Sequence, residues 1–144
     1  MGKLSYKLVE SGQELAEAFK VRKEVFVEEQ GISEDIELDN HDSEALHMVV
    51  KDGKRVIGTA RVLFPAPGVA KIGRMAVLGP FRRKGIGSSI ISFLNTELKS
   101  RQISKAILHA QHSSVAFYKS CGFEESGMPF DEAGIRHLRM EREL

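Results

Sequence analysis

The chain has 144 residues, which favours one domain large enough to bury a hydrophobic core without disulfides. Its composition, 42% hydrophobic and 28% charged residues, excludes global disorder, and a net charge of +1 argues against a strongly basic nucleic-acid-binding protein. The single cysteine excludes an intrachain disulfide. No apolar run approaches the 18 residues of a membrane span, and the N-terminus does not resemble a signal peptide. We therefore expect a cytoplasmic protein that does not associate with membranes.

The first half of the chain predicts a strand, a helix and a three-stranded meander. Leu4, Tyr6 and Leu8 alternate with polar residues, as in a half-buried strand. Ser11 and Glu14 have the spacing of a capping box, which predicts a helix that ends near Gly31. Strands are then expected at 46–50, 55–63 and 69–78, joined by a turn at 52–53 and a second turn at 65–68.

The second half predicts a crossover helix followed by smaller elements. Apolar residues recur at helical spacing from Ile86 to Leu98, which indicates an amphipathic helix. A strand at 105–111, a short helix at 113–121, a strand from Phe123 and a last strand at 135–140 follow. Because a helix separates them, strands 69–78 and 105–111 should be parallel neighbours, and the class is α+β with a mixed sheet.

Residues 28–44 contain eight acidic side chains and no Lys or Arg. This acidic belt, as we call residues 28–44, has two interpretations: it steers a cationic substrate toward a cleft, or it is a solvated surface loop. Arg74 is a charged residue inside a strand pattern, and it either faces a substrate or forms a structural ion pair.

The segment 82–88, with sequence RRKGIGS, lies between a strand and a helix and has the features of an anion site. Amides at a helix start lack intrahelical partners, and the helix dipole adds positive potential there. Gly85 and Gly87 lack the Cβ atoms that would block a close phosphate, although two turn glycines in a solvated basic loop would look the same. The segment matches neither a Walker loop nor the Rossmann fingerprint, so ATP and NAD are poor candidates.

Two motifs resemble those of the GNAT acetyltransferases. Arg82-x-x-Gly85-x-Gly87 matches the family signature [QR]-x-x-G-x-[GA], and residues 117–123 (FYKSCGF) resemble its F-Y-x-x-x-G-F segment. Residues 21–30 and 133–140 also resemble the small bacterial ElaA-type subgroup. The resemblance covers nearly the whole chain and implies one domain over 1–144, with a mixed, mostly antiparallel central sheet flanked by helices and splayed parallel strands four and five.

The resemblance implies acetyl-CoA as the acetyl donor. The pyrophosphate would lie on the loop amides, and the pantetheine arm would pair with strand four. Tyr118 would be the general acid that protonates the departing thiolate, unless its ring only packs in the core. Gln111 stands where relatives often have Asn. The cofactor-binding residues implied are Met75, Ala76, Val77, Arg82, Arg83, Lys84, Gly85, Ile86, Gly87, Ser88, Gln111 and Tyr118.

The general base is less defined, because Gly73 and Arg74 occupy the strand-four positions where some relatives have Glu. Glu29 is the first choice, since it lies in the segment shared with the subgroup. The remaining candidates are Glu28, Asp39, His47, His109, His112 and His137. His109 and His112 have poor spacing for a metal pair on a strand, so no metal is expected.

The leading hypothesis is an enzyme that transfers an acetyl group from acetyl-CoA to a primary amine of a small molecule or peptide, by direct attack in a ternary complex. The alternative is a non-catalytic acetyl-CoA-binding regulatory module. A nucleic-acid binder using the basic segment is a weaker third hypothesis, and the near-neutral charge argues against it. A monomer or a homodimer is expected.

Overall fold

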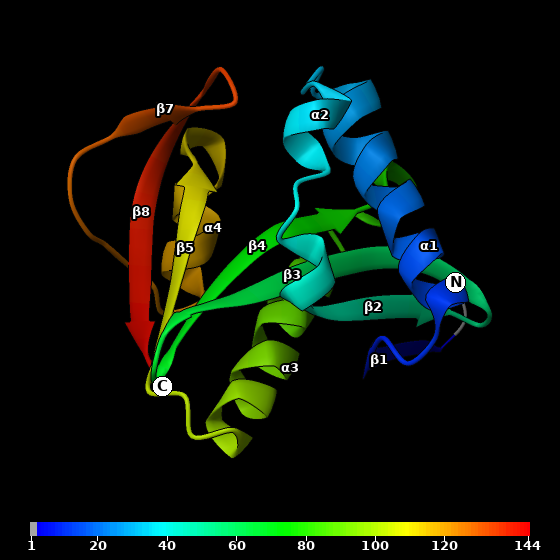
Figure 1. The fold of residues 1–144 in the computed structure, drawn as a ribbon, viewed down its shortest axis with the longest axis horizontal. Helices are drawn as coiled ribbons and strands as arrows, with labels where there is room; N and C mark the ends of the chain where they lie inside the picture. Colours follow the sequence, from blue (N-terminus) through cyan, green and yellow to red (C-terminus); the bar gives the residue numbers. More distant parts are fainter. Residues whose placement is uncertain (1–2) are drawn as a thin grey trace.

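A computed structural model describes residues 3–144 and has a mixed α+β architecture (Figure 1). The strands are β1 (Leu4–Leu8), β2 (Leu46–Asp52), β3 (Arg55–Ala66), β4 (Val69–Val77), β5 (Lys105–Gln111), β6 (Glu124–Glu125), β7 (Phe130–Glu132) and β8 (Ile135–Glu143). The α-helices are α1 (Gly12–Arg22), α2 (Glu34–Glu37), α3 (Ile86–Ser100) and α4 (Val115–Ser120). A π-helical segment, η1 (Lys23–Glu29), and three short 3-10 turns, η2 (Asp42–Glu44), η3 (Gly79–Phe81) and η4 (His112–Ser114), complete the described elements.

The strands form one sheet in the order β1-β2-β3-β4-β5-β8-β6, with β7 also paired to β8. The β4–β5 pair is parallel, and the other described pairs are antiparallel. This confirms the predicted meander, the predicted parallel neighbours and the predicted class. The helix α3 makes the crossover between the two parallel strands, as the sequence pattern indicated.

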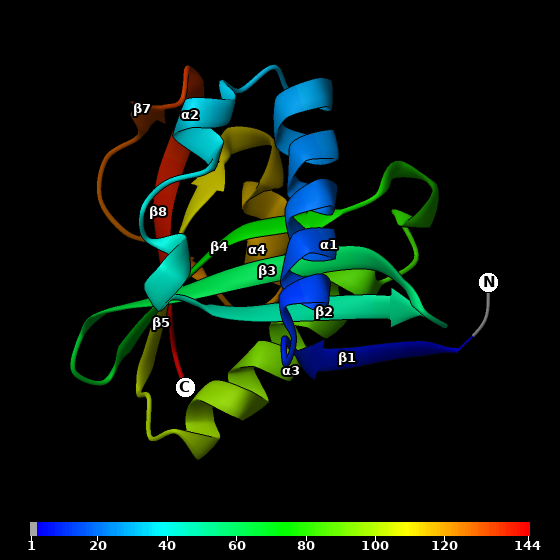
Figure 2. The ribbon, with the colours of Figure 1, turned by 45° about the vertical axis from the view of Figure 1, so that its right-hand side comes forward.

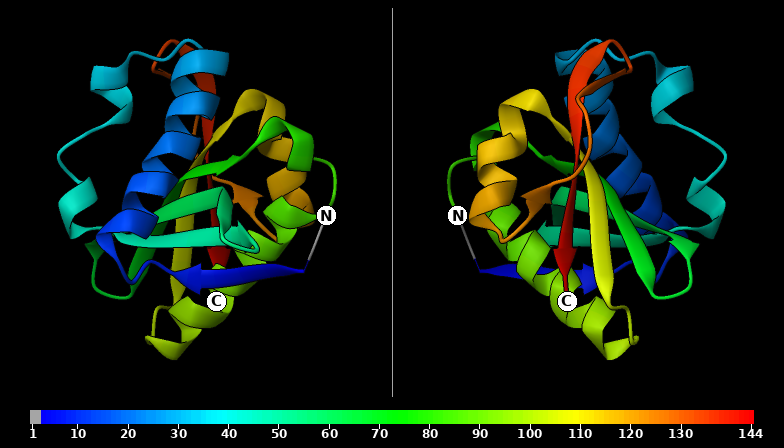
Figure 3. Two further views of the ribbon diagram at one scale, coloured as in Figure 1. Left: turned by 90° about the vertical axis from the view of Figure 1, so that its right-hand side faces the viewer. Right: turned by 90° about the vertical axis from the view of Figure 1, so that its left-hand side faces the viewer.

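Helices cover both faces of the central strands. The helix α1 lies across β2, β3 and β4 on one face (Figure 2), whereas α3 and α4 lie on the other face (Figure 3). Ile90, Leu94 and Leu98 on the predicted stripe of α3 are fully buried, and each such side chain contributes about 1.5–3 kcal/mol by leaving water. Within residues 3–144, no helix has the length and apolar composition needed to cross a membrane.

The first helix begins where the sequence predicted and ends differently. The Ser11 Oγ accepts a hydrogen bond from the Glu14 amide at 3.2 Å, and the Glu14 carboxylate accepts one from the Glu10 amide at 2.9 Å. The helix does not stay α-helical to Gly31, because it widens into η1 after Arg22. Its last turn closes through the Gln30 amide and the Val25 carbonyl at 3.2 Å, a spacing of five residues that is typical of a π-helix.

Candidate active site

A pocket of about 1180 Å³ opens where β4 and β5 separate. Of the residues implied by the sequence, it is lined by Met75, Ala76, Val77, Arg82, Arg83, Gly85, Ile86, Gly87, Ser88, Gln111 and Tyr118. Lys84 and Glu29 are not part of this lining. The structure therefore brings the strand, the loop, the helix start and the tyrosine to one cavity.

The gap between the parallel strands has a defined start. The pairing of β4 with β5 runs from Val69 and Lys105 to Ile72 and Leu108, and the strands diverge beyond it (Figure 1). The β4 edge that faces β5 over residues 73–77 therefore makes no ladder with it. An extended ligand could pair with this edge as an added strand does.

A β-bulge in β4 lies beside this gap. Thr59 of β3 faces Ala76 and Arg61 faces Gly73, so residues 74 and 75 of β4 oppose the single residue 60 of β3. Arg74 has a φ of 50°, in the left-handed region that non-glycine residues rarely adopt. Bulges bend a strand and disrupt its ladder, which helps to turn β4 away from β5.

The loop before α3 and the start of that helix line the same pocket. Gly85 is the N-cap residue, with a φ of 79° and no side-chain cap, and the first helical hydrogen bond there is from the Ser89 amide to the Gly85 carbonyl. Gly87 lines the pocket and also has a packing role, because a Cβ there would lie 3.0 Å from Cζ of Phe117. Gly85 thus supplies the backbone conformation, while Gly87 allows α3 and α4 to pack closely.

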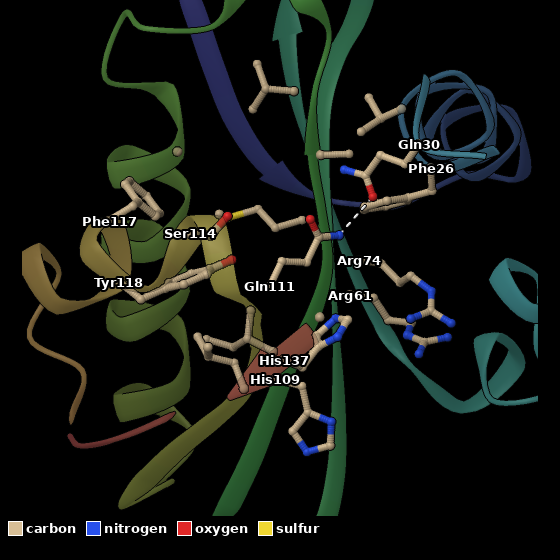
Figure 4. Close-up of a pocket in the computed structure, with 18 of the residues that line it drawn as sticks. Phe26, Gln30, Arg61, Arg74, His109, Gln111, Ser114, Phe117, Tyr118 and His137 are labelled. Atoms are coloured by element: carbon tan, nitrogen blue, oxygen red, sulfur yellow. Dashed lines mark hydrogen bonds between the residues drawn. The ribbon is translucent and has the colours of Figure 1, made fainter. Parts of the chain in front are cut away.

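Tyr118 of α4 reaches the pocket from the side opposite η1 (Figure 4). Its ring makes edge contacts with Phe117 and Phe123, at centroid distances of 5.1 and 6.0 Å. Burial, with a smaller contribution from Cys121, raises the pKa of Tyr118 above its usual range. Its hydroxyl makes no hydrogen bond to another residue within 3–144, so it is available to a bound molecule.

The comparisons with known proteins agree with this geometry. Residues 8–144 match the family model described as acetyltransferase (GNAT) domain. The chain is 36% identical to the uncharacterized N-acetyltransferase YjcF of Bacillus subtilis strain 168, over 94% of this chain and 97% of the relative. This chain belongs to the GNAT acetyltransferase family.

Solved structures show the same GNAT fold over full length. A structure from Lactobacillus plantarum matches with a TM-score of 0.93 and 27% identity, covering 99% of each chain. Escherichia coli ElaA matches with a TM-score of 0.86 and 23% identity, covering 97% of this chain and 99% of ElaA. The resemblance to the family is confirmed, the chain shares the fold of ElaA, and it is an acyltransferase.

In this GNAT structure, Arg82 and Glu29 bind each other. The Arg82 guanidinium donates to the Val77 carbonyl at 2.7 Å and to the Glu29 carboxylate at 2.9 Å. Arg82 thereby links the loop before α3, the end of β4 and η1. Glu29, the base favoured from the sequence, is engaged in this link and lies outside the pocket lining.

The acidic belt turns three of its carboxylates inward, toward three arginines. Arg22, 1% exposed, binds Glu37 at 2.6 Å and Asp42 at 2.8 Å. A second arginine, Arg61, binds Asp39 at 2.7 Å and Asp42 at 3.1 Å. Burial opposes ionisation of Asp42, but the hydrogen bonds from the two guanidinium groups hold its pKa below the usual range.

Arg74, on the bulge, joins the same network. It donates to the carbonyls of Ile36 and Glu37 and to the Asp39 carboxylate, each at 3.2 Å. It therefore forms a structural ion pair and also lines the pocket, so the two sequence-based interpretations of Arg74 do not exclude one another.

Two pocket contacts were not anticipated from the sequence. The Gln111 side chain donates to the Gln30 side chain at 2.8 Å, bridging the end of β5 and the end of η1 (Figure 4). Glu132 of β7 lines the pocket and accepts a hydrogen bond from His109 at 3.2 Å. Gln30 lay in a segment that resembled the subgroup, whereas no motif marked Glu132. In the part of the chain from 3 to 144, no group of three or more His, Cys, Asp or Glu side chains has an arrangement that could hold a metal ion.

Proposed function

We propose that this GNAT protein transfers the acetyl group of acetyl-CoA to a primary amine by direct attack in a ternary complex. The observation that carries the proposal is the convergence of the β4–β5 gap, the uncapped start of α3 and the Tyr118 hydroxyl on one pocket. We also propose that residues 1–144 act as one catalytic domain, since every described residue assigned to the site lies within it.

The donor fits the residues present. The amides at the start of α3 and the Arg83 side chain would hold the pyrophosphate, because both offer positive potential to an anion. The free β4 edge at Met75 to Val77 would pair with the amides of the pantetheine arm. This arrangement would place the thioester in the gap, beside Tyr118.

The chemistry then requires two proton transfers. The amine nitrogen attacks the thioester carbonyl, a carbon–nitrogen bond forms and the carbon–sulfur bond breaks. The Tyr118 hydroxyl donates its proton to the leaving sulfur, and a base removes the proton that the amine loses. The raised pKa of Tyr118 keeps the phenol protonated until the carbon–sulfur bond breaks, and its hydroxyl then donates to the developing thiolate.

The proposal is tested by mixing the protein and acetyl-CoA with spermidine, tyramine, lysine and a peptide with a free N-terminus. Thiol release is followed continuously, and mass spectrometry identifies the acetylated amine. We expect thiol release that depends on at least one amine. Tight acetyl-CoA binding by calorimetry without turnover of any amine would instead support the regulatory module.

A further inference from the structure

A histidine–carboxylate–histidine group lies in the wall of the pocket that β5, β7 and β8 form. His109 of β5, Glu132 of β7 and His137 of β8 all line the cavity. His109 Nδ1 is 3.2 Å from one Glu132 oxygen, and His137 Nε2 is 3.8 Å from the other. The Phe130 ring packs against both imidazoles, at centroid distances of 4.9 and 5.9 Å, and holds their orientation.

The partners of the two imidazoles fix which nitrogen carries the proton. A carboxylate only accepts hydrogen bonds, so the Nδ1 of His109 is the protonated nitrogen and its Nε2 carries a lone pair. The Ile135 carbonyl, 2.7 Å from Nδ1 of His137, fixes the same tautomer in that ring. The Nε2 of His137 then lies 3.8 Å from Glu132, whereas within residues 3–144 no hydrogen bond occupies the Nε2 of His109.

We propose that His109 is the general base of the acetyl transfer, and that Glu132 is the residue that positions it. This inference rests on the proposed function. His109 Nε2 takes a proton from the acceptor ammonium, and the freed amine attacks the thioester carbonyl. Tyr118 protonates the sulfur as the carbon–sulfur bond breaks, and the second proton of the acceptor nitrogen passes through water to the Tyr118 phenolate. The imidazolium of His109 later returns its proton to water.

The position of His109 supports this assignment. Leu108 is the last residue of β5 that pairs with β4, so His109 is the first residue of β5 beside the gap. The His109 side chain is 25% exposed, whereas that of His137 is 9% exposed. Glu29, in contrast, is bound to Arg82 and does not itself line the pocket.

Several charged side chains surround His109 and Glu132 and affect the charge states of both. Lys71 of β4 lines the same pocket, and Arg139 of β8 faces His109 across the strand pair. Arg139 is itself bound to Glu141 at 3.4 Å. The hydrogen bond from His109, with smaller electrostatic effects from His137 and Lys71, holds the pKa of Glu132 below its usual range despite partial burial. Glu132 is therefore ionised at neutral pH and stabilises an imidazolium.

The first experiment compares His109→Gln, His137→Gln and the control His112→Gln, using the amine from the panel that the wild type acetylates fastest. We expect kcat to fall at least about tenfold in His109→Gln, since general bases contribute about 100- to 10,000-fold. Acetyl-CoA binding and melting temperature should stay near wild type. Unchanged kcat in His109→Gln, or a loss confined to His137→Gln, would overturn the assignment. Failure of the wild type with every amine would instead overturn the proposed function.

The second experiment tests the role of Glu132 with Glu132→Gln. Its neighbour Asp131 binds the exposed Arg136 at 3.5 Å and lies outside the pocket lining, so Asp131→Asn is a matched control. Loss of the carboxylate destabilises the imidazolium, so the acidic limb of the kcat profile should move to lower pH only in Glu132→Gln. The same limb in both variants would refute a positioning role.

A third measurement needs no acceptor. Two-bond ¹H–¹⁵N NMR correlations of the free wild-type protein report the tautomer of each histidine. The proposal requires the Nδ1–H tautomer at His109. The Nε2–H tautomer there would overturn it, whatever amine the enzyme prefers.

Discussion

Replacement of Tyr118 by Phe should separate catalysis from binding and folding. The edge contacts of the ring with Phe117 and Phe123 do not involve the hydroxyl, so Phe at 118 retains them. Since the hydroxyl has no hydrogen-bond partner among residues 3–144, we expect stability to change by less than about 0.5 kcal/mol. A general acid contributes to the transition state, so kcat should fall at least about tenfold, which is about 1.4 kcal/mol of barrier.

The assay is amine-dependent CoA release, with calorimetric binding of acetyl-CoA measured on the same preparations. Tyr6 is the other tyrosine of the chain and lies on β1, so Tyr6→Phe is the matched control. Burial keeps Tyr118 protonated beyond the usual range, and wild-type activity should show no basic limb from this residue below a pH of about 10. Equal kcat in the wild type and Tyr118→Phe would refute the acid role.

The buried ion pairs of Glu37, the first helix and the loop before α3 give three further predictions. Glu37→Gln removes a charge that is 2% exposed and should lower the free energy of unfolding by about 3 kcal/mol in urea titrations. Glu34→Gln, on the exposed side of α2, should change that free energy little. Equal free energies of unfolding in the two variants would contradict a stabilising role of the buried ion-pair network. The pKa of Glu14 is lowered from 4.5 to about 2, chiefly by the hydrogen bond from Lys7, so its stabilisation is complete above its ordinary pKa and is lost as the pH falls toward 2. Melting temperatures across that pH range should fall more steeply in the wild type than in Glu14→Gln, and parallel curves would argue against this coupling. Arg83→Glu should reduce the rise in melting temperature that acetyl-CoA produces, whereas Lys99→Glu, at the far end of α3, should not. An equal rise in both variants would show that Arg83 does not contribute to acetyl-CoA binding.

Much of the fold follows from local patterns. Alternation in the first strand, the turn signals of the meander, the apolar stripe of α3 and the order of the elements led to the correct class and to the parallel β4–β5 pair. The π-helical segment and the bulge at Arg74 could not be predicted in this way. The bulge depends on a contact between distant segments, because Arg74 is held by Asp39, 35 residues earlier in the chain.

The candidate site likewise contains residues that the sequence identified and contacts that it could not predict. The loop and Tyr118 lie in motifs with fixed spacing, so sequence alone named them. The contact of His109 with Glu132 joins residues 23 positions apart on different strands, and only the return of the chain through β7 brings them together. Likewise, the sequence of the acidic belt did not predict that arginines of α1, β3 and β4 neutralise three of its carboxylates.

That neutralisation changes what the acidic belt can do. With Glu37, Asp39 and Asp42 bound to arginines, steering of a cationic acceptor would depend on the carboxylates that remain at the surface. The paired carboxylates also help to hold the bulge of β4, because they bind the side chain of Arg74, which lies on that bulge beside the gap between β4 and β5. A left-handed arginine costs about 1–2 kcal/mol, and its three hydrogen bonds offset that cost. The belt thus stabilises the strand geometry on which the proposed donor site depends.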